Sequence, residues 1–123
     1  MTDLSNEQFE TCNEYLVLVS NLTGIAVNDI TGNHRHERIA EARQLTMWAL
    51  VTLCGMTHQQ VGILMRRHHS TVTYSVSHIA QGYGGREIEK MKNEIKNYHK
   101  NKSNSYKCCF NFSHLMFIYV ISY

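Results

Sequence analysis

Apolar residues in the first half of the chain recur at helical spacing in two long stretches. The first stretch follows Ser5-x-x-Gln8, a capping-box pattern that opens a helix, and Gly24 is placed to end it. The second runs from about residue 35 to 54, and Gly55 after it suits a helix C-terminus. Two helices are predicted, with a short helical turn from Asn28-Asp29 between them. Their apolar stripes are Phe9, Cys12, Leu16, Val19 and Leu22, then Ile39, Ala42, Leu45 or Thr46, Ala49 and Leu53, with Trp48 expected in the core.

The centre of the chain predicts a short helix, a polar turn and a second helix. Thr57-x-x-Gln60 is another capping box and opens a helix over residues 57–65. Residues 66–69 are polar, and the next helix begins at His69 or Ser70. This order of elements is typical of a helix-turn-helix. The second helix has an apolar face of Val72, Val76 and Ile79, and its other face holds Ser70, Thr71, Thr73, Tyr74, Ser77 and His78.

The last third of the chain predicts a charged helix and then an apolar tail. Residues 86–102 place Ile88, Met91, Ile95 and Tyr98 on one side, and lysines on a side that we expect to be solvated or to flank DNA. Residues 103–123 hold one lysine and no acidic residue, which suits either a loosely specified tail or a segment buried by a partner protein.

Together these patterns predict an all-α fold, a small helical bundle with a central helix-turn-helix. We expect the helix-turn-helix domain over residues 1–82, a charged helical extension over 83–102 and the apolar tail over 103–123.

The charge of the chain is uneven, although its net value is only +2. Residues 1–30 carry five carboxylates and no Lys or Arg, whereas residues 31–123 carry twelve Lys and Arg against five Glu. A basic segment of this kind suits nucleic acid or an acidic protein surface, and the charge alone does not choose between them.

Several classes of protein are disfavoured by what the chain lacks. A chain of 123 residues suits one domain, no GxxxxGK[ST] phosphate loop occurs, and the longest apolar run, residues 115–121, is far too short to span a bilayer. No basic-then-apolar leader precedes the first predicted helix, so we expect a cytoplasmic protein with reduced cysteines. The eight histidines lack partners at metal-ligand spacing, and no paired carboxylates or nucleophile–base set occur. We therefore expect no metal, no cofactor and no enzymatic activity.

The N-terminal turn of the second helix carries side chains suited to the edges of DNA bases. The major groove is about 12 Å wide and admits a helix with short side chains at its tip. Ser70 and Thr71 offer hydroxyl groups, and His69 can donate to a purine N7 or a phosphate. Arg66 and Arg67 lie in the turn, where they can reach phosphates or a guanine edge. Ser70 also suits the helix N-cap, a role that does not exclude a base contact.

The stretch from about Val19 to Gln81 resembles the C-terminal DNA-binding domain of the bacterial replication initiator DnaA. Arg67-His68-His69-Ser70-Thr71-Val72 is similar to the family's signature Arg-Asp-His-Thr-Thr-Val. Val61-Gly62 resembles the Ile-Gly of its first helix-turn-helix helix. Residues 25–30 resemble its segment between early helices, and Arg35 followed by Arg43-Gln44 resembles its long basic helix.

The resemblance implies a role for individual residues. His69, Ser70 and Thr71 fall on the residues that contact bases of an AT-rich nonamer in the major groove, and Arg35 on the arginine that enters the minor groove. Arg43 and Gln44 fall on a pair near phosphate, and Gln59 on a proline near thymine methyl groups. Double-stranded DNA is the implied partner, and replication initiation or its regulation the implied role.

The chain departs from the family pattern at three places. His68 stands where the family has aspartate, which exchanges an acceptor for a donor or weak acceptor and changes the expected base preference. Before Arg67 the chain is one residue shorter than in the family, and Met65-Arg66 stands in place of the usual Gly-Gly. Glu37 and Glu41 lie where the family is more basic, which weakens phosphate binding. The alternative is a protein-interaction module or transcriptional regulator that uses the acidic first helix and the apolar tail.

Overall fold

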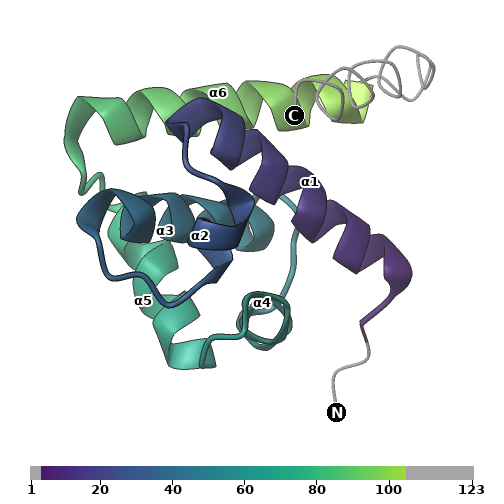
Figure 1. Ribbon diagram of the computed structural model, residues 1–123. Coiled ribbons are helices and arrows are strands. Elements are labelled where there is room, and N and C mark those ends of the chain that lie inside the picture. The colour runs from purple at the N-terminus through teal and green to yellow at the C-terminus, as the bar shows by residue number, and fades with distance from the viewer. Residues whose placement is uncertain (1–3, 105–123) are drawn as a thin grey trace.

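Six helices make up the computed structural model, which describes residues 4–104 (Figure 1). The all-α prediction is confirmed over these residues, which contain no strand. The last helix includes Ser103 and Asn104, the first two residues of the predicted tail, and residues 105–123 lie outside the described part. The helices are α1 (Asn6–Thr23), α2 (Val27–Thr31), α3 (Glu37–Thr52), α4 (His58–Met65), α5 (His69–Ala80) and α6 (Gly85–Asn104).

The two predicted capping boxes are both formed. Ser5 Oγ accepts from the N–H of Gln8, whose side chain accepts from the Ser5 N–H, and Thr57 and Gln60 do the same at α4. Gly24 ends α1 in the left-handed region at φ 75°, and its N–H donates to the Ser20 carbonyl. These ends were predictable because each depends on residues three or four positions apart.

The start of α3 differs from the prediction. The helix begins at Glu37, two residues after Arg35, because His36 is its N-cap and its Nδ1 accepts from the Arg38 N–H (3.3 Å). Arg35 therefore lies in the loop between α2 and α3, where it is exposed. α2 begins at Val27, one residue earlier than predicted.

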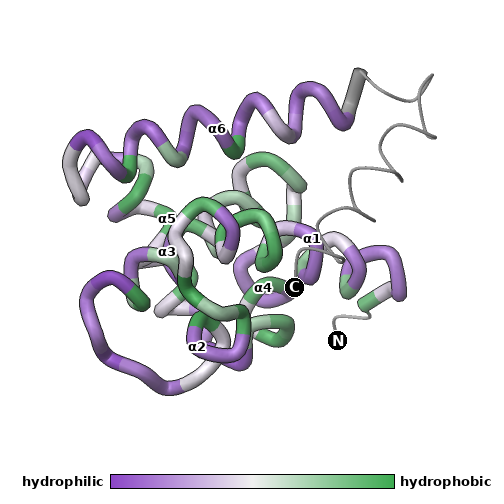
Figure 2. Tube along the Cα trace, turned by 45° about the horizontal axis from the view of Figure 1, so that its top comes forward, coloured by the Kyte–Doolittle hydropathy of each residue, from purple (hydrophilic) through white to green (hydrophobic). Residues whose placement is uncertain are grey.

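Helix α3 is the centre of the bundle, in contact with each of the other five helices (Figure 1). Figure 2 shows the apolar segments gathered between the helices, while the loop after α2 and the length of α6 are largely hydrophilic. Six consecutive residues of α3, residues 45–50, are buried, so this helix has no solvated side at that level. Trp48 is in the core, as predicted, whereas Phe9 at the start of the predicted α1 stripe is 48% exposed and the fully buried aromatic of α1 is Tyr15.

Helix α6 packs against α1 and α3 instead of extending away from them (Figure 1). Ile88 and Ile95 are buried in the common core, in agreement with the predicted apolar side. Buried Glu14 on α1 accepts from the Tyr98 hydroxyl and from Lys102 Nζ (2.7 Å). Both ends of α6 are therefore fixed to the bundle, one by apolar contacts and the other by a carboxylate.

Lys92 was expected on the solvated lysine side of α6, and the structure contradicts this. Its side chain is only 8% exposed, and its Nζ donates to the carbonyl of Ile79 (2.9 Å) and to Glu89 (3.2 Å). The ammonium lies 5.5 Å from the centre of the Trp48 ring. Because Ile79 is in the last turn of α5, the lysine places a positive charge at the negative end of that helix.

The described cysteines, Cys12 and Cys54, are free thiols. Burial raises the pKa of the Cys12 thiol to about 11, with a smaller contribution from nearby Cys54. Burial also raises the pKa of Cys54. Both thiols are therefore protonated at neutral pH.

We predict that Lys92→Ala lowers the free energy of unfolding by about 1–3 kcal/mol, because it removes a charge-assisted hydrogen bond and the packing of the stem on Trp48. Urea unfolding measures the change. Lys96→Ala is the matched control, since Lys96 also lies over the Trp48 ring (5.9 Å) but is exposed. Equal effects of the two substitutions would contradict the buried role of Lys92.

Candidate nucleic-acid interface

The turn between α4 and α5 is unusually tight, and Gly62 makes it possible. The N–H of Arg67 donates to the carbonyl of Gly62 (2.8 Å), and Arg66 lies in the left-handed region at φ 57°. A Cβ on Gly62 would stand 2.6 Å from the Arg67 carbonyl oxygen. Only a glycine at position 62 lets the Arg67 backbone pack this closely against α4. This contact fixes the orientation of α5 relative to α4.

Helix α5 begins one residue earlier than Ser70, and its N-cap is His68. The His68 Nδ1 accepts from the Ser70 N–H (3.2 Å) and contacts the Ser70 hydroxyl (2.8 Å). The interpretation of Ser70 as the N-cap is therefore wrong, because the residue two positions before it occupies that place. Since Nδ1 is an acceptor, the Ser70 hydroxyl donates to it and keeps its oxygen lone pairs for an outside donor. The His68 ring also packs on His69, with 4.3 Å between ring centres.

One face of α5 is buried and the opposite face is exposed, as the pattern predicted. Val72 and Ile79 are buried, and so is Ser75, which the pattern did not single out. His69, Ser70 and Thr71 are all exposed at the N-terminal end of the helix, which lies beside α4 and away from α6 (Figure 1). The three side chains expected to contact bases are therefore brought together on one accessible helical turn.

The residue Thr73, also on this face, is held by the protein itself. Its hydroxyl donates to the His69 carbonyl (3.0 Å) and is 2.7 Å from His58 Nδ1. Because that hydroxyl donates elsewhere, it accepts from the His58 N–H. This bond ties the first turn of α4 to the first turns of α5.

Beyond the first turns of α5, an aromatic stack continues along its exposed side. Tyr74, 61% exposed, stacks on His78 with 5.4 Å between ring centres, and His78 stacks on Tyr83 at 4.8 Å. Tyr74 therefore stacks on His78 of its own helix, and His78 in turn stacks on Tyr83 in the following loop.

An open hollow lies over the turn and collects five of the predicted site residues. Its lining also includes Ile63, an apolar side chain that is 53% exposed and that the sequence patterns did not identify. Its exposure follows from the α4 periodicity, which buries Val61 and Met65 on the other side. The predicted residues that line the hollow are Gln59, Arg66, Arg67, His68 and His69.

Arg35 and Gln44 lie outside that hollow. Arg35 is exposed in the loop before α3, and Gln44 is half-buried on α3. In this loop His34 Nε2 lies 3.3 Å from the Asp29 carboxylate of α2, and both side chains are about half exposed.

The guanidinium group of Arg43 points into the protein and binds the loop that carries Arg35. Its Nε donates to the Ile30 carbonyl (2.8 Å), and its Nη2 to the carbonyls of Gly32 and His34 (3.0 Å each). Arg67 Nη2 donates to the same Gly32 carbonyl. Burial lowers the pKa of Arg43, and the nearby charge of Arg67 lowers it further.

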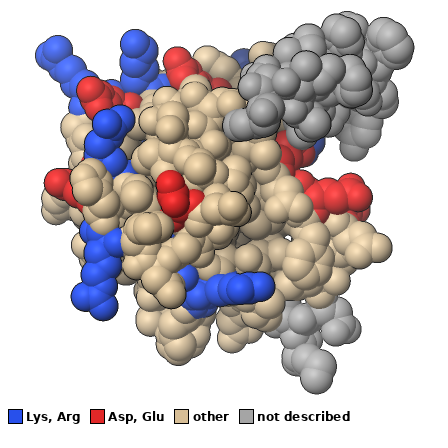
Figure 3. All heavy atoms as spheres, in the orientation of Figure 1, with Lys and Arg blue, Asp and Glu red and all other residues tan. Residues whose placement is uncertain are grey.

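Separate basic side chains lie on the mostly uncharged surface at the end of the molecule where α4 and α5 meet. In Figure 3 the lower third of the visible face shows Lys and Arg side chains and no Asp or Glu among the coloured atoms. In Figure 1, which has the same orientation, that part of the view holds α4 and the N-terminal end of α5. The exposed first turn of α5 therefore has basic side chains near it (Figure 3) and is itself uncharged apart from its histidine.

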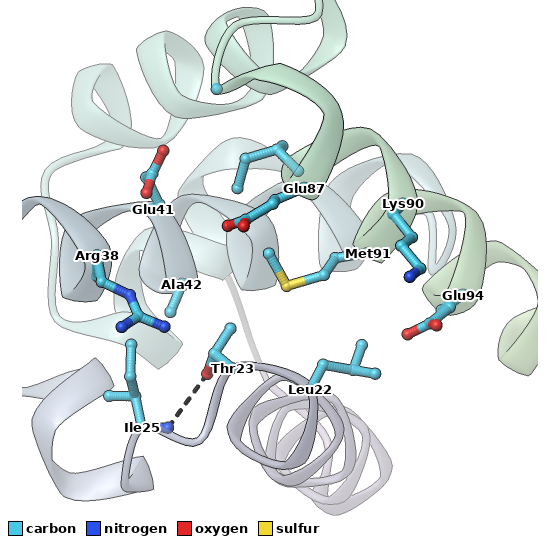
Figure 4. Close-up of a pocket in the computed structure, with 12 residues that line it drawn as sticks. Leu22, Thr23, Ile25, Arg38, Glu41, Ala42, Glu87, Lys90, Met91 and Glu94 are labelled. Carbon is cyan, nitrogen blue, oxygen red and sulfur yellow. Dashed lines mark hydrogen bonds between the residues drawn. The ribbon is translucent and has the colours of Figure 1, made fainter.

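A second hollow, of about 280 Å³, lies among α1, α3 and α6 (Figure 4). Leu22, Ala42 and Met91 line its apolar part, and charged groups of both signs surround it. Thr23 is the only hydroxyl in its lining, and it donates to the Val19 carbonyl (2.7 Å). The lining residues therefore contain no nucleophile paired with a base.

Two features are absent from the part of the chain that the structure describes. No group of three or more His, Cys, Asp or Glu that could hold a metal ion occurs among residues 4–104. In the same part of the chain, every helix is too short or too polar to cross a membrane.

We predict that Gly62→Ala lowers the free energy of unfolding by about 1–3 kcal/mol, because the added methyl group overlaps backbone that cannot move without opening the turn. Thermal or urea unfolding measures it. Ile63→Ala, at the exposed neighbouring position, is the control and should change stability by about 0.5 kcal/mol or less. A stable Gly62→Ala variant would show that the turn tolerates a side chain.

We also predict that His68→Ala costs about 1 kcal/mol, because α5 loses its N-cap, and that His68→Asp restores this stability. Aspartate accepts from the same N–H groups and adds a negative charge at the positive end of the helix. Unfolding of the two variants side by side tests this, and equal stability of both would exclude a capping role.

Comparison with known proteins agrees with this geometry. No curated protein matches the chain. Residues 16–79 match the family described as the bacterial DnaA protein helix-turn-helix. The matched segment covers just over half of the chain and runs from α1 to the last turn of α5, so it contains the tight turn, the His68 cap and the exposed first turn of α5. The chain belongs to the bacterial DnaA helix-turn-helix family.

Proposed function

We propose that this protein binds double-stranded DNA at a specific sequence through the N-terminal turn of α5, with an AT-rich nonamer as the site. The observation that carries the proposal is the exposed set of His69, Ser70 and Thr71 on a helix end whose opposite face is buried. Such an end enters the major groove with short side chains toward the base edges. Replication initiation or its regulation is the role that family membership favours.

The surroundings of α5 supply the contacts that do not depend on sequence. Arg66 is exposed in the turn, and the N-terminus of α5 itself favours a phosphate. Gln44 is half-buried on α3, and in this proposal the exposed part of its side chain contacts a phosphate. Gln59 is exposed on α4. Exposed Arg35 precedes α3, and in this proposal it enters the minor groove beside the site.

His68 limits how closely the specificity follows the family. Its Nδ1 accepts as the N-cap of α5, so Nε2 is the ring nitrogen that remains as a donor. An aspartate there would accept from a base amino group, whereas this histidine donates. We therefore propose an altered preference at the base pair next to the one that His69 contacts.

Fluorescence anisotropy with two labelled duplexes tests the proposal. One duplex carries an initiator-type AT-rich nonamer and the other a scrambled sequence, each measured across a salt series. We expect tighter binding to the nonamer and a steep loss of affinity with salt for both duplexes. Equal, salt-sensitive binding would refute the nonamer but keep DNA binding. Absence of binding to either would favour the protein-interaction alternative.

Thr71→Ala tests the recognition helix directly. We expect a loss of about 1–3 kcal/mol in binding to the nonamer and little change with the scrambled duplex, because the methyl and hydroxyl groups contact bases and not phosphates. Thr52→Ala, at an exposed threonine on the last turn of α3, is the matched control. Unchanged nonamer affinity in Thr71→Ala would remove this helical turn from the interface.

A further inference from the structure

We propose that Arg43 and Arg67 are positioning residues that lock the loop carrying Arg35 to the turn of the helix-turn-helix. The inference rests on the proposed function, because it assigns Arg35 and α5 to adjacent grooves of one duplex. It replaces a phosphate-binding role for Arg43 and Arg67 with one inside the protein.

The convergence of the two guanidinium groups on one carbonyl oxygen is the central observation. Arg43 on α3 and Arg67 in the α4–α5 turn both donate to the carbonyl of Gly32. Arg43 also binds the carbonyls of Ile30 and His34, so its fork spans the loop on both sides of Gly32. The residue after His34 is Arg35, whose backbone is thereby held one residue from the clamp.

The backbone of Arg67 is fixed as firmly as its side chain. Its N–H donates to the Gly62 carbonyl (2.8 Å), inside the tight turn, while its guanidinium also contacts the Arg66 carbonyl (3.2 Å). One residue therefore joins the start of α5 to a loop 35 positions earlier in the sequence. A rotation of α5 relative to the loop would break this contact.

The hydrogen bonds of the two guanidinium groups to the loop all go to backbone carbonyl oxygens. Asp29, the acidic residue of α2, contacts His34 Nε2 (3.3 Å). Two like charges that share an acceptor repel each other, in agreement with the lowered pKa of Arg43. The pair persists because the guanidinium forks satisfy several backbone carbonyls that would otherwise face solvent or remain unpaired.

The consequence for binding is a fixed spacing between two groove-contacting elements. The major and minor grooves of a duplex alternate at set distances, so a loop already held in place reaches its groove without a further loss of conformational freedom. Without the clamp, the loop would have to be ordered on binding. The clamp therefore raises specific affinity without touching DNA.

Salt dependence separates a positioning role from a phosphate contact. Each neutralised phosphate contributes about 0.9 to the slope of log affinity against log salt concentration. A residue that acts only through the loop leaves that slope unchanged. Arg43→Lys adds a second distinction, because lysine keeps the charge for a phosphate but cannot form the three divergent hydrogen bonds.

The experiment compares Arg43→Ala, Arg43→Lys and Arg67→Lys with Arg38→Ala, an exposed arginine on the same helix α3. For the Arg43 and Arg67 variants we expect a roughly 10-fold or greater loss of nonamer affinity, an unchanged salt slope and no rescue by lysine. Arg43→Ala combined with Arg35→Ala should bind about as well as Arg35→Ala alone, since both remove the same contact. Rescue by lysine, a slope reduced by about one, or additive losses would each overturn the proposal.

A measurement without DNA keeps the clamp testable if the nonamer is not the site. Backbone ¹⁵N relaxation of residues 33–35 should show lower order parameters in Arg43→Lys than in the wild type and Arg38→Ala, with α1, α3 and α5 unchanged. Unchanged order parameters would refute the clamp whatever the DNA result. If the wild type does not bind the nonamer, the proposed function is refuted. The relaxation measurement then tests the clamp on its own.

Discussion

The close approach of Gly62 to the Arg67 backbone is the constraint on which the rest of the interface depends. With no side chain at Gly62, α4 ends directly against the residues that begin α5, and the turn closes in three residues. That geometry places His68 as the cap of α5. It also sends the Arg67 side chain back toward Gly32. The direction of α5, its cap and its link to the Arg35 loop thus follow from one backbone contact.

The far end of α5 is held by a different kind of interaction. Lys92 of α6 donates to the Ile79 carbonyl while its ammonium lies over the Trp48 ring of α3. Helix α6 is in turn fixed to α1 by Glu14, which binds Tyr98 and Lys102. Helix α6 has the charge pattern of a solvated extension, yet it packs in the bundle. It therefore helps to hold α5, which carries the candidate site. The segment matched to the family ends at α5, and in this chain α6 completes the packing around it.

Much of the candidate site could be predicted because its signals are local or specific. The exposed turn of His69, Ser70 and Thr71 follows from the apolar spacing of Val72 and Ile79 together with the family signature. The roles of Arg43 and Arg67 could not be predicted in the same way. A long cationic side chain reaches carbonyl groups, phosphates or solvent equally well, and its partner depends on which backbone lies within its reach. Nothing in the sequence near Arg43 or Arg67 indicates that both reach Gly32.

The sequence by itself determined the number of helices in the described part, their capping boxes and the buried face of α5, because these depend on residues within one or two turns of each other. It did not determine that His68, and not Ser70, caps α5, since both can accept a backbone N–H. Tertiary structure decided that, together with the burial of Lys92 and the clamp on Gly32. The cap itself is a bond between residues two positions apart, and the tight turn selects it. The burial of Lys92 and the clamp on Gly32 need groups far apart in the chain, and only the packing of the helices brings those groups within hydrogen-bonding distance.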